Sequence, residues 1–189
     1  MNIFSELETE YNYTHNELLM AKYVLTCIVY EASKIFLLTI IFYFLHKLDV
    51  FAISFIFLFI LRTNGGGIHF NNYFMCFIST LFLFLMTTMI LPDLVTVSYG
   101  FMVVSSFIFI HALLKVGPIA SPLRPKANGK TIIQCKIISV SVIIFFIILA
   151  GIFNLMEIGN LYIQVIYQTI LLHVFQLVVA KILRKRGLY

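Results

Sequence analysis

Residues 137–156 read IISVSVIIFFIILAGIFNLM and carry no charged side chain. About 20 apolar residues in a helix cross the roughly 30 Å hydrocarbon core of a bilayer. Only helices and closed barrels satisfy the backbone polar groups there. Strands of a membrane barrel alternate apolar and polar residues, whereas this stretch is apolar on every face. It therefore predicts a membrane-spanning helix.

The same character extends along the chain of 189 residues, which is 61% hydrophobic and 11% charged, with a mean hydropathy of +1.02. Soluble domains are closer to half apolar and a quarter charged. From Val50 to Leu114 the only charged side chains are Arg62 and Asp93. The composition excludes a soluble enzyme, a disordered chain and a disulfide-stapled module. It predicts an all-α, polytopic integral membrane protein.

Four long spans are clear, at Tyr73–Leu91, Leu94–Leu114, Ile137–Met156 and Leu161–Ala180. We expect Pro92 and Asp93 to break the first pair, because proline interrupts the helical hydrogen bonds. Glu157, Gly159 and Asn160 break the second pair. Residues 34–45 and 50–61 are shorter, about 18 Å each as helices, unless flanking residues lengthen them. We expect six crossings, with four crossings plus a re-entrant hairpin as the alternative.

We expect a single membrane domain over residues 1–189. Within it, residues 1–33 form an amphipathic, interfacial N-terminal region, residues 34–180 the transmembrane core, and residues 181–189 a basic cytoplasmic tail. The first 17 residues are acidic and polar, so no cleavable signal peptide is predicted.

The net charge of +5 comes largely from two basic segments, the loop 115–136 and the tail 181–189. Basic residues beside apolar spans are typical of cytoplasmic anchors, so we predict no binding to nucleic acid. An even number of spans separates the loop 62–72, the loop 115–136 and the tail. All three are therefore expected on the same, cytoplasmic side.

One polar stretch, ILRTNGGGIHFNNYFMCF at residues 60–77, interrupts the apolar pattern. Polar groups at membrane depth are costly and usually functional. Asn71 or Asn72 is a plausible N-cap, which places Cys76 about one turn into the following helix, where the dipole favours an anion. His69 lies seven residues before Cys76. That is about 10.5 Å along an unbroken helix, so the chain must turn if His69 is to act as its base.

A structural interpretation of the same residues is also open. Three glycines suit a flexible turn, Arg62 suits a snorkelling anchor, and buried cysteine is ordinary in packed interiors. Spacing alone favours this structural interpretation for Cys76. We interpret Cys27 and Cys135 as structural.

The segment RTNGGGIHFNNYFMC (62–76) resembles the signature of the AgrB family, membrane endopeptidases of Gram-positive quorum-sensing systems. The segment GPIASPLRPKANGK (117–130) is similar to the proline- and lysine-containing loop of that family. The resemblance implies that Cys76 is the nucleophile and His69 its base. It implies cleavage of an AgrD-like precursor peptide with an amphipathic leader through a thioester, and cyclisation to a thiolactone or lactone autoinducing peptide. It also implies a homodimer in the bacterial cell membrane, with a cytoplasmic active site and no cofactor.

Several further roles would complete such a site. The N–H groups of Gly65, Gly66 and Gly67 are candidates for an oxyanion hole. Arg62 suits a substrate carboxylate, and Asn71 or Asn72 suits an orienting role toward His69. The basic residues Arg124, Lys126 and Lys130 are candidates for holding an acidic substrate tail.

The alternative function is a non-enzymatic small transporter or export-channel subunit. Such a protein would be expected to carry ionisable residues inside its spans or broken helices in matched halves. His173 is the one ionisable side chain well inside a long predicted span, so the peptidase is favoured. An intramembrane metalloprotease would need a ligand set such as HExxH, which is absent from the sequence, so no metal is predicted.

Overall fold

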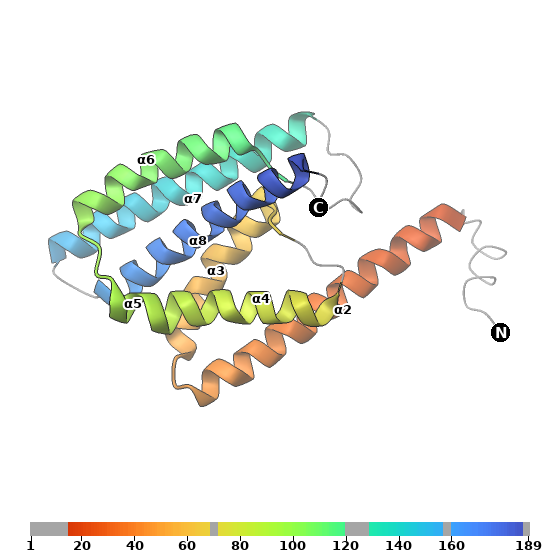
Figure 1. The fold of residues 1–189 in the computed structure, drawn as a ribbon, viewed down its shortest axis with the longest axis horizontal. Coiled ribbons are helices and arrows are strands. Elements are labelled where there is room, and N and C mark those ends of the chain that lie inside the picture. Colours follow the sequence, from red (N-terminus) through yellow and green to blue (C-terminus); the bar gives the residue numbers. More distant parts are fainter. Residues whose placement is uncertain (1–14, 69–71, 120–128, 157–159, 187–189) are drawn as a thin grey trace. The chain divides into compact units, whose positions relative to one another are not determined.

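The computed structural model describes residues 15–68, 72–119, 129–156 and 160–186. These residues contain helices and no β-strand, with the elements in the order α2 (His15–Phe44), α3 (Leu48–Gly65), α4 (Tyr73–Leu85), the π-helical turn η1 (Met86–Ile90), α5 (Leu91–Leu94), α6 (Tyr99–Val116), α7 (Gly129–Met156) and α8 (Asn160–Lys185) (Figure 1). The prediction of an all-α fold is confirmed.

Six of the helical segments in the described ranges are long and apolar enough to cross a membrane. The predicted count of six crossings is therefore confirmed over the re-entrant alternative. Residues 34–45 lie within the 30-residue helix α2, and residues 50–61 lie within the 18-residue helix α3. Flanking residues thus lengthen both short apolar segments to full spans.

The chain divides into two compact units, Met1–Phe44 and Leu45–Tyr189. The first unit contains α2, which runs without a break across the boundary that we predicted at residue 33. Its polar side chains bond along the helix: Lys34 contacts Glu31 one turn earlier, and Thr39 Oγ1 donates to the Ile35 carbonyl at 2.8 Å. Such local bonds reduce the cost of polar groups in a membrane. The single domain and the interfacial placement of residues 1–33 stay predictions.

Helix α8 is the centre of the second unit, where it packs against α3, α6 and α7 (Figure 1). Its span is 67% buried, against 22–39% for the other spans of this unit. The core consists of apolar side chains from these four helices, among them Leu61, Phe109, Phe146 and Ile170. Because α8 is enclosed, any polar side chain on its inner faces must find a partner inside the protein.

The break after the third span lies later than predicted. The helix continues from α4 through η1 and α5 to Leu94, so Pro92 lies inside the helical segment. Pro92 occupies the first turn of α5, where a missing N–H is tolerated. The wider π-helical turn η1 comes immediately before it, and the Leu91 N–H donates to the Met86 carbonyl. The second break agrees with the prediction, since α7 ends at Met156 and α8 begins at Asn160.

The first half of α8 bonds its buried polar side chains to its neighbours. The Gln164 amide pairs with the Val97 backbone, donating to the carbonyl at 2.7 Å and accepting from the N–H at 3.1 Å. The Thr169 hydroxyl lies 2.7 Å from Ser54 Oγ of α3. These bonds fix α8 to the connection before α6 and to α3.

Candidate functional site

The glycine stretch forms a tight turn at the end of α3. Gly65 is the last residue of the helix, and the Gly66 N–H caps it by donating to the Arg62 carbonyl at 2.9 Å. Gly66 has φ 79° and ψ −148°, a conformation that is essentially restricted to glycine. We call residues Gly65–Ile68 the glycine turn.

The glycine turn docks on the segment that follows α6. The Ile119 N–H donates to the Gly65 carbonyl at 3.0 Å, and Gly66 forms an isolated parallel β-bridge with Ile119. A Cβ atom on Gly66 would lie 1.9 Å from the Ile119 carbonyl oxygen. Glycine is therefore required at position 66 by its conformation and by the close approach of the two backbones.

Arg62 contacts the last residue of the glycine turn. Its guanidinium nitrogen Nη2 donates to the Ile68 carbonyl at 3.1 Å, immediately before His69 in the chain. A guanidinium carries five N–H donors, so this contact uses only part of its capacity. The role of Arg62 toward a substrate carboxylate stays a prediction, and the structure adds a role in shaping the turn.

Cys76 lies in the first turns of α4, as predicted. Asn72 is the N-cap: its Oδ1 accepts from the Phe74 N–H at 2.9 Å, and its carbonyl accepts from the Cys76 N–H at 3.1 Å. The choice between Asn71 and Asn72 as the cap is thereby decided for Asn72. The Cys76 side chain is 7% exposed. Cys27 lies in mid-helix in α2, and Cys135 lies in the second turn of α7.

Several predicted site residues lie outside the described residues, namely His69, Asn71, Arg124 and Lys126. Lys130 lies at the start of α7 and is exposed. The oxyanion role of the glycines stays a prediction. The Gly66 N–H donates to the Arg62 carbonyl, so capping the helix is one established use of the glycine turn.

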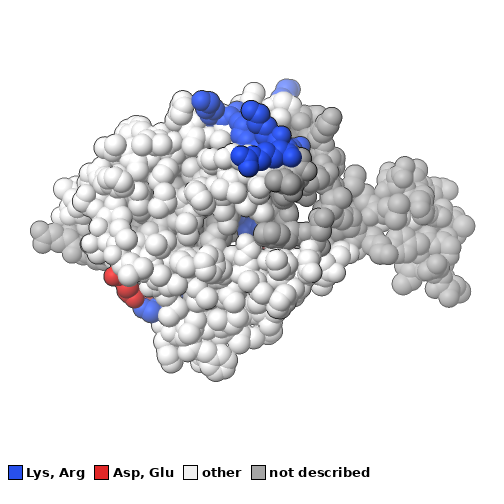
Figure 2. All heavy atoms as spheres, viewed as in Figure 1, with Lys and Arg blue, Asp and Glu red and all other residues white. Residues whose placement is uncertain are grey.

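The basic segments meet at one end of the second unit. Lys136 Nζ donates to the Leu114 carbonyl and Lys181 Nζ to the Lys115 carbonyl, each at 2.9 Å. Both carbonyls belong to the last turn of α6, where lysine commonly caps a helix. Figure 2 shows lysine and arginine atoms gathered over the end of the bundle where α8 finishes. Together with the bridge between Gly66 and Ile119, these contacts bring described parts of the three predicted loops to one end of the second unit, and their common cytoplasmic side stays a prediction.

A residue that the sequence analysis did not assign to the site lies beneath the glycine turn. His173 of α8 is fully buried, and a Cβ atom on Gly65 would lie 3.1 Å from its Nε2. One turn further along α8, Gln176 approaches Gly67, with 3.9 Å between its Oε1 and a Cβ built there. The signal for His173 was its position as an ionisable side chain inside a long span. Its proximity to residue 65 depends on tertiary packing.

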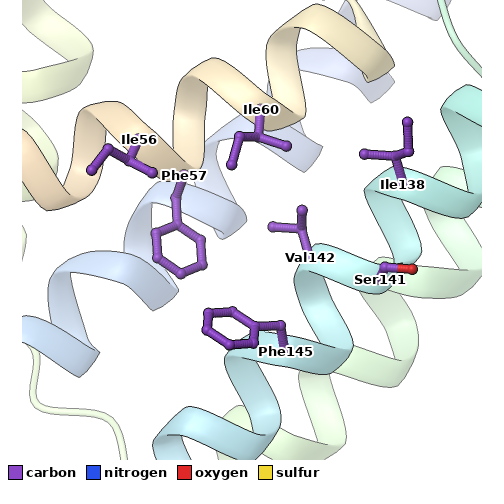
Figure 3. Close-up of a pocket in the computed structure, with 7 residues that line it drawn as sticks. All are labelled: Ile56, Phe57, Ile60, Ile138, Ser141, Val142 and Phe145. Carbon is purple, nitrogen blue, oxygen red and sulfur yellow. The ribbon is translucent and has the colours of Figure 1, made fainter.

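A separate cavity of about 310 Å³ lies between α3 and α7 (Figure 3). The aromatic rings of Phe57 and Phe145 stack across it, with their centroids 6.4 Å apart. Its lining includes no cysteine, histidine or carboxylate and none of the candidate site residues; it consists of Ile56, Phe57, Ile60, Ile138, Ser141, Val142 and Phe145. The cavity is therefore not a catalytic candidate.

Comparison with known proteins agrees with the resemblance seen in the sequence. The family model for accessory gene regulator B, AgrB, matches residues 1–177. A protein of Clostridium beijerinckii, named as AgrB-like, is 29% identical over 136 residues. The aligned stretch covers 70% of this chain and 65% of the relative's own length. No solved structure matches the chain.

Proposed function

Since the chain belongs to the accessory gene regulator B family, we propose that it is a membrane cysteine endopeptidase that cleaves and cyclises a precursor peptide for quorum sensing. One observation supports this most directly. Cys76 stands at the capped start of α4, just beyond a glycine turn that Arg62 shapes around the residue before His69. Because α3 ends at Gly65 and α4 begins at Tyr73, His69 and Cys76 do not lie on one unbroken helix, so the axial separation of about 10.5 Å that such a helix would impose does not apply.

In the first step His69 takes the proton of the Cys76 thiol, and the thiolate sulfur attacks the scissile carbonyl carbon. The carbonyl oxygen becomes an oxyanion, for which the backbone N–H groups of Gly65, Gly66 and Gly67 are the candidate donors. The C–N bond then breaks. The imidazolium of His69 returns the proton to the leaving amine, and the N-terminal part of the peptide stays on Cys76 as a thioester.

In the second step a thiol or hydroxyl within the bound peptide attacks the thioester carbonyl. The attacking group loses its proton to His69, and Cys76 leaves as the thiolate, which takes that proton back. The product is a thiolactone when the attacking residue is cysteine and a lactone when it is serine. The energy of the thioester drives ring closure, so no nucleotide or metal cofactor is needed.

The substrate in this proposal is an AgrD-like precursor whose amphipathic leader lies on the bilayer. Its acidic tail would lie near Arg124, Lys126 and Lys130. The basic end of the second unit faces the cytoplasm, because lysine and arginine concentrate on that side of bacterial membrane proteins. The enzyme acts there as a homodimer.

The proposal is tested by cleavage of a precursor peptide in vesicles that contain the purified full chain. The variants Cys76→Ala and His69→Ala should each abolish cleavage, while Cys27→Ala and Cys135→Ala should retain it. Cleavage that persists in Cys76→Ala would refute the proposal.

A further inference from the structure

His173 is a buried polar side chain that the proposed mechanism does not use. It is 0% exposed, and neither ring nitrogen has a hydrogen-bond partner among the residues that the structure describes. A neutral imidazole carries one donor and one acceptor. Two such groups left unpaired in an apolar interior reduce stability, so they call for an explanation.

Other buried polar residues of α8 do not share this condition. Gln164 pairs with both polar groups of Val97, and Thr169 bonds to Ser54 and to the Val165 carbonyl. Gln168 donates to the Val95 carbonyl at 3.4 Å and keeps one unpaired oxygen. Within the described ranges, His173 is therefore distinguished from these residues because both of its ring nitrogens are unpaired.

The position of His173 connects it with the candidate site. Its ring lies against Gly65 at the end of α3, and any side chain at that position would press on Nε2. On its other side the turn is bonded to Ile119. The glycine turn is thus held between the backbone of Ile119 and the face of α8 that carries His173 and Leu177.

We propose that His173 is a positioning residue for the glycine turn, and that its unused hydrogen bond is made to the backbone of the turn in the transition state of thioester formation. The inference rests on the proposed function. A hydrogen bond that is absent in the resting protein and in the bound ground state, and present in the transition state, lowers the barrier to reaction instead of tightening substrate binding. Its effect reaches Cys76 through the alignment of the turn that leads to His69 and α4.

Three variants of the full chain test this role in vesicles, with thioester formation on Cys76 as the readout. His173→Leu fills the space without a hydrogen bond and should lower kcat about tenfold with little change in KM, as expected for one lost hydrogen bond. His173→Gln keeps a donor and an acceptor and should recover most of that loss. The matched control Gln168→Leu removes another unpaired buried atom from the same helix and should leave kcat unchanged.

Stability provides a second readout that separates positioning from packing. His173→Leu removes two unpaired polar atoms, so its melting temperature should rise by about 2–4 °C, the shift expected per kcal/mol for a chain of this size. A rise in stability together with a fall in kcat supports the inference. A fall in stability would show that the imidazole is already bonded in the resting protein, and this would overturn it.

Two further outcomes would also overturn the inference: a kcat in His173→Leu within twofold of wild type, or a His173→Gln variant as slow as His173→Leu. The proposed function fails separately, and it does so if the wild-type chain itself forms no thioester on Cys76.

Discussion

The two halves of α8 treat their buried polar side chains differently. In the first half, the Gln164 amide is bonded on both sides to Val97, and Thr169 is bonded to Ser54 across the interface with α3. In the second half, His173 lies fully buried against the glycine turn with neither ring nitrogen bonded to a described residue. The same helix thus contains a half whose polar groups mainly stabilise the fold and a half with unused bonding capacity.

This difference indicates which residues of the second unit mainly stabilise the fold and which are available for function. Natural proteins tend to leave polar groups unsatisfied where function requires it and to satisfy them elsewhere. Substitutions in the first half should therefore change stability more than rate. Substitutions around the glycine turn should change rate more than stability.

The largest effect is expected from Gly66→Ala, in the glycine turn that the second half of α8 contacts through His173. The conformation of Gly66 alone costs a residue with a side chain about 1–3 kcal/mol, and the added methyl group would collide with the Ile119 carbonyl. We expect the turn to lose its contact with Ile119. Precursor cleavage should fall by more than about 100-fold, since small misplacements near a reacting centre have effects of that size. Cleavage rates in vesicles measure this.

Gly100→Ala is the matched control, because nothing lies within 4 Å of a Cβ atom at that position. It should cleave at the wild-type rate. Normal cleavage by Gly66→Ala would show that the docking of the turn on Ile119 has no part in the chemistry.

In the first half of α8, the substitution Gln164→Leu should mainly destabilise the fold. It removes both bonds to the half-buried backbone groups of Val97, and each such bond contributes about 0.5–1.5 kcal/mol. The melting temperature in detergent should fall by several degrees, while kcat of the remaining folded protein stays within about twofold. A large loss of kcat without a loss of stability would contradict the distinction between the two halves of α8.

Substitutions in the basic loop 115–136 test the proposed contact with the acidic tail of the substrate. Replacing Arg124, Lys126 and Lys130 by glutamine should raise KM several-fold at low salt, and the difference should shrink as salt screens the charges. The topology and kcat should not change. An effect of equal size at high salt would argue against an electrostatic contact with an acidic peptide tail.

Ser54→Ala should have the smallest effect of the set. It removes the hydroxyl that bonds Thr169 at 2.7 Å and Thr87 at 3.3 Å, but Thr169 keeps its bond to the Val165 carbonyl and Thr87 its bond to the Phe84 carbonyl. A hydrogen bond contributes about 0.5–1.5 kcal/mol, and because both partners keep another bond, the melting temperature should fall slightly at an unchanged rate. Thermal unfolding in detergent measures the shift, and a measurable loss of kcat would contradict the assignment of this contact to stability.

The spans could be predicted from the sequence because apolar length alone determines whether a helix can cross a bilayer. The predicted end of the third span at Leu91 is three residues early, since the helix continues to Leu94 and the π-helical turn η1 has no strong sequence signature. The cap at Asn72 followed from local chemistry. Such features depend on residues close together in the chain.

The surroundings of the glycine turn could not be predicted in the same way. Three glycines indicate a turn, but they do not indicate which segment approaches it. The contacts with Ile119 and His173 join residues more than 50 positions apart, and they arise from the packing of α8 against both α3 and α6. The position of His173 inside a span marked it as unusual without showing its neighbour.

The central claim is that Cys76 carries the peptide as a thioester, and mass spectrometry of a trapped intermediate tests it most directly. The wild-type chain in vesicles is given a precursor whose ring-closing cysteine or serine is replaced by alanine, so that the second step cannot occur. We predict an adduct with the mass of the N-terminal part of the peptide on the fragment that contains Cys76. An adduct on Cys27 or Cys135, or complete cleavage with Cys76 never modified, would contradict the account.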